Sequence, residues 1–212
     1  MNERILLSIC IFAASGLLGS GCGGSNHHAP PPSCLEAAPC GGDVVGTWNF
    51  LGGCENLPAA NAESQLSCPG SAIRGFALSF SGQLTFNADS TYTASNWHES
   101  VSANETVPLS CVGLPTCHSL NMTASDATST TSIMCSGTGT CSCRIAATNN
   151  LASDTGTFTA YGTTLTMSGP QTSGGFSYCV QGDLLHLLSV GTMLDSTGQP
   201  VVLSDVVAQR MP

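Results

Sequence analysis

Val44-Val45-Gly46-Thr47-Trp48-Asn49-Phe50 is the stretch that decides the fold. Side chains in a β-strand point alternately to its two faces, so Val44, Trp48 and Phe50 share one side, which predicts a strand with a buried apolar face. Three hairpin patterns follow, at residues 83–94, 156–167 and 176–190, each with turn residues between two strand-like runs. Short strands and no long helical period predict an all-β barrel or sandwich, with loops at residues 51–72 and 112–139.

The Gly46-Thr47-Trp48 strand and its hairpins resemble lipocalin-like domains, in which a Gly-x-Trp motif lies on the first strand. The resemblance covers most of residues 43–207 and implies a small antiparallel up-and-down barrel of a kind common in bacterial envelope lipoproteins. It also implies that Trp48 seals one end of the barrel under an arginine from a late strand. The many cysteines and the long loop after Phe50 depart from the typical lipocalin, which leaves open whether the barrel is hollow or filled.

Arg210 is the best placed arginine to cover Trp48. Only Arg74, Arg144 and Arg210 follow residue 22, and Arg210 ends a strand-like run that returns beside the first strand if the barrel closes. We therefore predict a cation–π contact between Arg210 and Trp48; a solvated arginine near a frayed terminus is the alternative. Trp97 falls on the strand face opposite Tyr92, which places it either outside the barrel or on a strand reoriented by a bulge.

The amino-terminal residues read as a lipoprotein signal peptide, residues 1–21. A charged start precedes an apolar run from Ile5 to Gly19, which is short for a bilayer span of about 30 Å. The sequence Leu17-Leu18-Gly19-Ser20-Gly21-Cys22 resembles the lipoprotein cleavage box, which implies lipid attachment at Cys22; ordinary secretion with a plain Cys22 thiol is the alternative. No aspartate follows Cys22, which by the same resemblance points to the outer membrane. Residues 22–42 are predicted as a Gly/Pro-rich tether and residues 43–212 as the barrel domain.

Ten cysteines follow Cys22, and an even number in an exported chain predicts disulfide bonds. They are Cys34, Cys40, Cys54, Cys68, Cys111, Cys117, Cys135, Cys141, Cys143 and Cys179. No pair has the C-x₂-C spacing of most structural zinc sites, so we predict no metal site and no cofactor. Sequence does not fix the connectivity, although the short spacings make Cys34 with Cys40 and Cys111 with Cys117 reasonable local loops.

The charge balance and the motifs exclude several function classes. The chain has 13 acidic and 4 basic residues and a net charge of −9, which disfavours nucleic acid as a partner. His98-Glu99 is half of an H-E-x-x-H motif, but residue 102 is serine. His118 and His186 are predicted as surface imidazoles. No spacing singles out a catalytic pair among the carboxylates that could meet in the fold, so we predict no enzyme activity. Those carboxylates are Glu99, Glu105, Asp126 and Asp154.

Two functions remain for an exported, membrane-anchored barrel. The first is a binding module for a small hydrophobic ligand, lined by aromatic and apolar residues predicted to face inward. The candidates are Phe86, Tyr92, Phe158, Leu165 and Tyr178. The second is a structural or protein-interaction module with a filled barrel, in which loops held by disulfides contact another envelope component. The sequence does not identify the protein partner.

Overall fold

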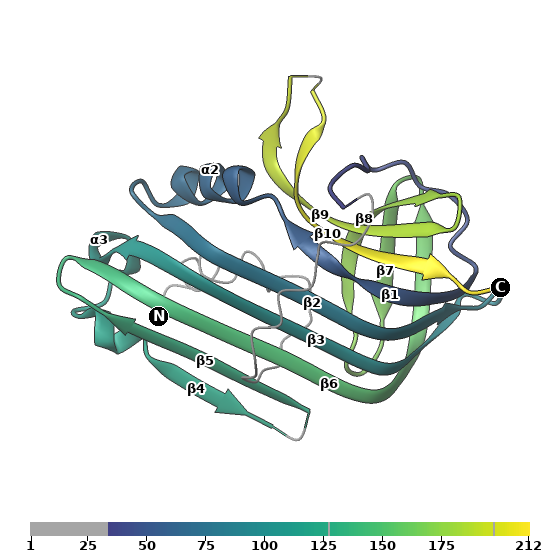
Figure 1. The fold of residues 1–212 in the computed structure, drawn as a ribbon, viewed down its shortest axis with the longest axis horizontal. Coiled ribbons are helices and arrows are strands. Elements are labelled where there is room, and N and C mark those ends of the chain that lie inside the picture. The colour runs from purple at the N-terminus through teal and green to yellow at the C-terminus, as the bar shows by residue number, and fades with distance from the viewer. Residues whose placement is uncertain (1–33, 127, 197) are drawn as a thin grey trace.

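The computed structural model describes residues 34–126, 128–196 and 198–212 (Figure 1). The strands are β1 (Gly46–Glu55), β2 (Ala72–Phe86), β3 (Thr91–Pro108), β4 (Met122–Ser125), β5 (Ser129–Ser136), β6 (Thr140–Tyr161), β7 (Thr164–Ser168), β8 (Gly174–Gln181), β9 (Leu184–Leu194) and β10 (Pro200–Arg210). The helical elements are α2 (Leu57–Ser67), α3 (Leu109–Val112) and the 3-10 turn η1 (Cys117–Leu120).

Eight of these strands form a closed antiparallel barrel, which confirms the predicted fold class. The order is β1-β2-β3-β6-β7-β8-β9-β10, and β10 pairs with β1 to complete the circle. The three predicted hairpins appear as β2–β3, β6–β7 and β8–β9. The two predicted loops are wrong in part, because residues 51–72 contain the end of β1 and helix α2, and residues 112–139 contain η1, β4 and β5.

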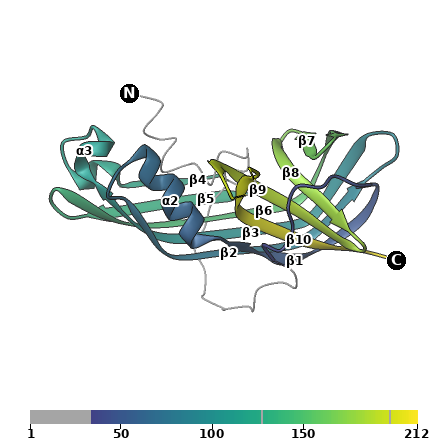
Figure 2. The ribbon, with the colours of Figure 1, turned by 90° about the horizontal axis from the view of Figure 1, so that it is seen from above.

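Strand β6 is 22 residues long and belongs both to the barrel and to an open sheet beside it. Its last residues pair with β7 inside the barrel, whereas residues 142–149 pair with β5 on one edge and with β3 on the other. Figures 1 and 2 show β2, β3 and β6 continuing past the barrel as an open sheet that β5 and β4 widen. We call this part the sheet extension.

Arg210 covers Trp48 at one end of the barrel, as predicted. The two residues are paired in the β1–β10 register, and the guanidinium carbon lies 4.3 Å from the centroid of the indole ring. The guanidinium also donates to the backbone oxygens of Val45 and Asp43, at 2.7 and 2.8 Å. Gly46 has a φ of 138°, and a Cβ there would lie 3.0 Å from the guanidinium, so the glycine of the Gly-x-Trp motif makes room for this contact.

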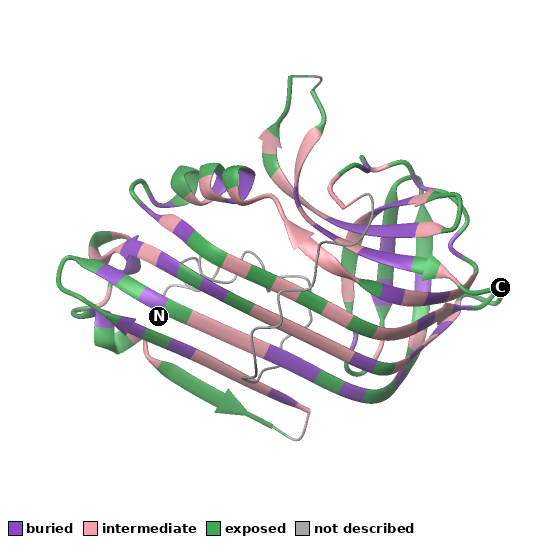
Figure 3. Ribbon diagram, viewed as in Figure 1, coloured by how far each residue is buried: buried purple, intermediate pink, exposed green. Residues whose placement is uncertain are grey.

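The inner face of the barrel carries one apolar core, and Figure 3 shows its buried residues alternating with exposed ones along the strands. Trp48 is fully buried, and its indole N–H donates to the backbone oxygen of Val44 at 2.7 Å. Leu185 and Leu187 of β9 also belong to this core, because residues two apart on a strand share one face.

Helix α2 joins β1 to β2 and lies against the β9–β10 hairpin. Asn56 caps its first turn, because the side-chain oxygen accepts from Ala59 N at 3.2 Å. Glu63, on the buried side of the helix, accepts from the backbone N–H groups of Thr192 and Met193 at 3.1 and 3.2 Å, and from the Thr192 hydroxyl. Backbone donors therefore fix the helix to the end of β9.

Candidate functional site

The five candidate lining residues all lie in the core on the inner face of the barrel. Each is at most 7% exposed. Phe86 and Phe158 pack edge to face with ring centroids 4.7 Å apart. The Tyr92 hydroxyl donates to the backbone oxygen of Thr172 at 2.6 Å, and the Tyr178 hydroxyl donates to Gly42 O at 3.0 Å. Leu165 is fully buried. These side chains pack against one another and against the chain's own backbone.

A bulge in β3 brings Trp97 into the barrel, which resolves the alternative that the sequence left open. Asn96 has a φ of 50°, and the β2–β3 register shifts between Ser81 and Gln83. A bulge adds one residue and so reverses which face the following side chains occupy. Trp97 is consequently only 3% exposed and lies in the same core as Tyr92.

Trp97 forms an aromatic cluster with Phe50 of β1 and Phe80 of β2. The Trp97 ring packs edge-on against both phenylalanines, at centroid distances of 4.9 Å to Phe50 and 5.9 Å to Phe80. The two phenylalanine rings are 5.9 Å apart. Phe50 follows Trp48 by two residues, so this cluster lies one step along the barrel from the end that Arg210 covers.

Glu99 lies beside this aromatic cluster on the same inner face. It follows Trp97 by two residues, and the strand registers place it between Phe80 of β2 and Asn149 of β6. Its Oε2 is buried and has no hydrogen-bond partner among the described residues. Burial raises the pKa of Glu99 to about 7, and the nearby Trp97 indole opposes the shift. The indole Nε1 approaches the carboxyl without a well-formed hydrogen bond and has no other partner in the described chain.

Two further glutamates have buried carboxyl groups and no partner charge among the described residues. Glu55 pairs with Ser204 at the end of β1, and neither of its buried carboxylate oxygens has a hydrogen-bond partner within the ranges described. Glu105 lies on the sheet extension and is 7% exposed. Burial raises the pKa of Glu55 to about 8 and that of Glu105 to about 7.

The four carboxylates considered for catalysis do not meet. Glu99 and Glu105 share one face of β3 but are six residues apart, which corresponds to about 20 Å along a strand. Asp154 is buried elsewhere in the barrel and accepts from Thr172 N at 2.7 Å. Asp126 is exposed at the end of β4. Within the described ranges, no three His, Cys, Asp or Glu side chains gather in a way that could hold a metal ion.

Stability should fall as the pH rises, because Glu55 holds its proton more strongly in the folded state than in the unfolded chain. Between about pH 4.5 and 8 the folded protein binds more protons, so the free energy of unfolding decreases with pH across this window. We expect Glu55→Gln to flatten the profile and to raise the free energy of unfolding at pH 8 by about 1 to 3 kcal/mol. Urea denaturation from pH 5 to 8.5 measures this.

The matched control is Glu36→Gln, at an exposed position, which should leave the slope unchanged. A slope in Glu55→Gln equal to that of the wild type would show that Glu55 ionises normally in the folded protein.

All ten cysteines after Cys22 are paired, which confirms the prediction of disulfide bonds. The pairs are Cys34–Cys54, Cys40–Cys179, Cys68–Cys111, Cys117–Cys141 and Cys135–Cys143. The suggested local loops, Cys34 with Cys40 and Cys111 with Cys117, are wrong. Strand register decides the outcome: Cys135 and Cys143 are cross-strand neighbours in β5 and β6, on a face that Cys141 shares with Cys143.

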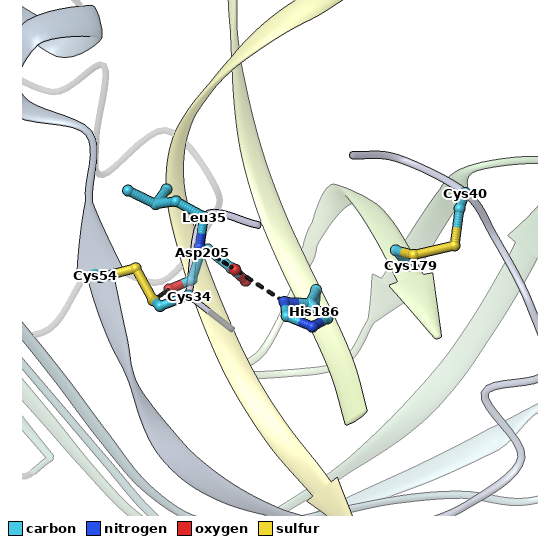
Figure 4. Close-up of polar contacts among 7 residues, drawn as sticks. All are labelled: Cys34, Leu35, Cys40, Cys54, Cys179, His186 and Asp205. Carbon is cyan, nitrogen blue, oxygen red and sulfur yellow. Dashed lines mark hydrogen bonds and ion pairs between the residues drawn. A yellow bond between two sulfur atoms is a disulfide. The ribbon is translucent and has the colours of Figure 1, made fainter. Parts of the chain in front are cut away.

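Residues 34–42, which we call the strap, are held against the barrel rather than extending from it as a tether. One disulfide joins Cys34 to Cys54 of β1, and another joins Cys40 to Cys179 of β8 (Figure 4). Gly41 adds a backbone bridge beside Cys179, with Val180 N donating to Gly41 O at 2.8 Å. The strap therefore runs from β1 to β8, across β10 and β9.

His186 and Asp205 lie beneath the strap, and both side chains are completely buried (Figure 4). His186 Nδ1 lies 2.9 Å from Asp205 Oδ2, and Leu35 N donates to the same oxygen at 2.9 Å. The prediction that His186 is a surface imidazole is wrong, because the strap covers the outer face of β9. His118 is exposed on η1, as predicted, and His98 contacts Asn150 on the opposite face of β3 from Trp97.

Sequence reasoning did not single out Glu55 or Asn149, and it considered Glu99 only as a catalytic candidate and not as a neighbour of Trp97. The period-two pattern from Trp97 to Glu99 and onward to Glu105 was available as a signal, but only after a bulge is placed at Asn96.

No helix among the described residues has both the length and the apolar character needed to cross a bilayer. Comparison with protein-family models, with curated proteins and with solved structures gives no match.

Proposed function

We propose that the protein is a lipid-anchored binding protein of the cell envelope, whose barrel takes a small, largely apolar ligand against Phe50, Phe80 and Trp97. The observation that carries this proposal is the pair of unsatisfied polar groups beside these rings, Trp97 Nε1 and Glu99 Oε2. Leaving buried polar groups without hydrogen bonds costs about 1 to 3 kcal/mol each, so such groups favour a ligand that supplies the missing partners.

Envelope location and lipid attachment rest on the sequence. Cys22, which lies outside the described residues, follows an apolar run and three small residues. Five disulfides support an oxidising compartment, because such bonds persist outside the cytosol. More than one acyl chain on Cys22 would give stable membrane anchoring, and the residues after it favour the outer membrane.

The proposal is tested with the full chain expressed in its own host. A palmitate analogue should label the wild type and not the Cys22→Ser variant, and label retained by the variant would contradict the lipid anchor. Native mass spectrometry of the purified protein should show a small molecule released on unfolding. Its mass should be absent from a Trp97→Ala variant that elutes and melts as a folded protein. Protein without any released mass, recovered with a stoichiometric protein partner, would contradict the ligand-binding role.

The second candidate function is a protein-interaction module, and strand β4 favours it. All four residues of β4 are exposed, and β4 pairs only with β5, so its outer edge has free backbone groups in the described chain. Such an edge can accept a strand from another protein. A partner lost on Ala124→Pro but retained by Trp97→Ala would favour this function.

A further inference from the structure

A cation stabilises the charged form of a buried carboxyl, and the described part of the chain supplies none near Glu99. The sequence contains no lysine. Among the described residues, Arg74 and Arg144 are exposed, and Arg210 is occupied at Trp48, Val45 and Asp43. His98, the neighbour of Glu99, lies on the other face of β3 and contacts Asn150. In the empty protein a proton neutralises Glu99, and a counter-charge to its ionised form would come from another molecule.

The surroundings of Glu99 suit one kind of cation. Three aromatic rings from three different strands lie together at 4.9 to 5.9 Å. Aromatic faces attract ammonium groups, and the attraction grows when water is excluded. The buried amide of Asn149, opposite Glu99 in the β3–β6 register, can accept a further N–H bond. The Trp97 indole, 3% exposed, lies beside the same carboxyl and favours its charged form, the form that attracts an ammonium group.

We propose that the ligand is a small protonated amine with an apolar body, whose ammonium group binds the Glu99 carboxylate beside the Phe50, Phe80 and Trp97 rings. This inference rests on the proposed binding function and adds the charge of the ligand. A neutral ligand would leave Glu99 without a counter-charge, and an anionic one would place two negative charges in a buried environment. The site therefore disfavours a phosphorylated or carboxylated ligand.

Binding should also release a proton. Burial raises the pKa of Glu99 to about 7, so near neutral pH the empty site holds about half a proton, which leaves when an ammonium group arrives. Calorimetry in buffers of different ionisation enthalpy measures this number directly. In Glu99→Gln the proton release should be absent.

The experiment uses the full chain and three probes of similar size, 2-phenylethylamine, 2-phenylethanol and 3-phenylpropanoate, followed at pH 8 by calorimetry and tryptophan fluorescence. We expect the amine to bind at least about tenfold more tightly than the alcohol, which is a difference of about 1.4 kcal/mol, and we expect no binding of the anion. Glu99→Gln should remove the preference for the amine and keep the binding of the alcohol. Glu105→Gln, six residues further along the same face, is the matched control and should keep the preference.

The outcomes separate the two proposals. Equal affinities for amine and alcohol, or an amine preference that survives in Glu99→Gln, would overturn the amine inference and leave the binding function standing. Absence of binding for all three probes, together with no co-purified molecule, would overturn both. Thermal melting of each variant shows that it is folded, and alcohol binding by Glu99→Gln provides a second check that its site is intact.

Discussion

Replacing both Cys40 and Cys179 with alanine should lower the free energy of unfolding by about 5 kcal/mol. Their disulfide joins residues 139 apart in the sequence, the widest separation among the five disulfides. In the chain-entropy account, a disulfide stabilises the folded state by restricting the unfolded chain, and a loop of this length contributes about 5 kcal/mol. The loss is comparable to the whole net stability of many domains, so the variant should be largely unfolded near 37 °C.

The matched control is the double alanine variant of Cys135 and Cys143, whose disulfide spans only 8 residues. It removes the same number of sulfur atoms from the protein, but the same entropy relation gives only about 2.5 kcal/mol. Urea denaturation of both variants at one pH measures the two losses. Equal losses would show that local packing, rather than the length of the closed loop, determines what each disulfide contributes.

The contact between Trp48 and Arg210 could be predicted because few residues compete for each role. Three arginines follow residue 22, and a barrel that closes must bring its last strand beside its first. Period-two alternation alone predicts that residues 44–50 form a strand and that Val44, Trp48 and Phe50 lie on one face of it. The same alternation fails at Trp97, because a single extra residue at Asn96 reverses the faces of everything that follows on β3.

The remaining wrong predictions concern residues whose contacts are made with distant parts of the sequence. His186 looks like an outward-facing strand residue, and it is one, but the strap lies over that outer face and buries it. The strap itself reads as part of a spacer, since nothing local in residues 34–42 reveals disulfides to β1 and β8. Cysteine spacing along the chain has no bearing on pairing once strands are formed, because cross-strand register sets which sulfur atoms meet. In the sequence, Glu99 could be noted only as half of a failed motif and as one of four carboxylates without a distinctive spacing.

Asp205→Ala should lower the free energy of unfolding by about 2 to 6 kcal/mol, because two donors lose their acceptor and each buried group left without a hydrogen bond costs about 1 to 3 kcal/mol. Asp205 Oδ2 is the shared acceptor for His186 Nδ1 and Leu35 N, each at 2.9 Å, and its loss leaves the buried imidazole and the half-buried amide without this acceptor. His186 would then have neither ring nitrogen bonded to a described residue, since its Nε2 already lacks a partner. Asp205→Asn keeps one side-chain oxygen and should lose less, and Gln209→Ala, at an exposed position of the same strand, should change little.

Hydrogen exchange at Leu35 N locates the effect, because its amide should lose protection in Asp205→Ala while the Cys34–Cys54 and Cys40–Cys179 disulfides remain closed. An Asp205→Ala variant within about 1 kcal/mol of the wild type would mean that the two disulfides alone hold the strap, with the pair beneath it adding only what an ordinary hydrogen bond contributes.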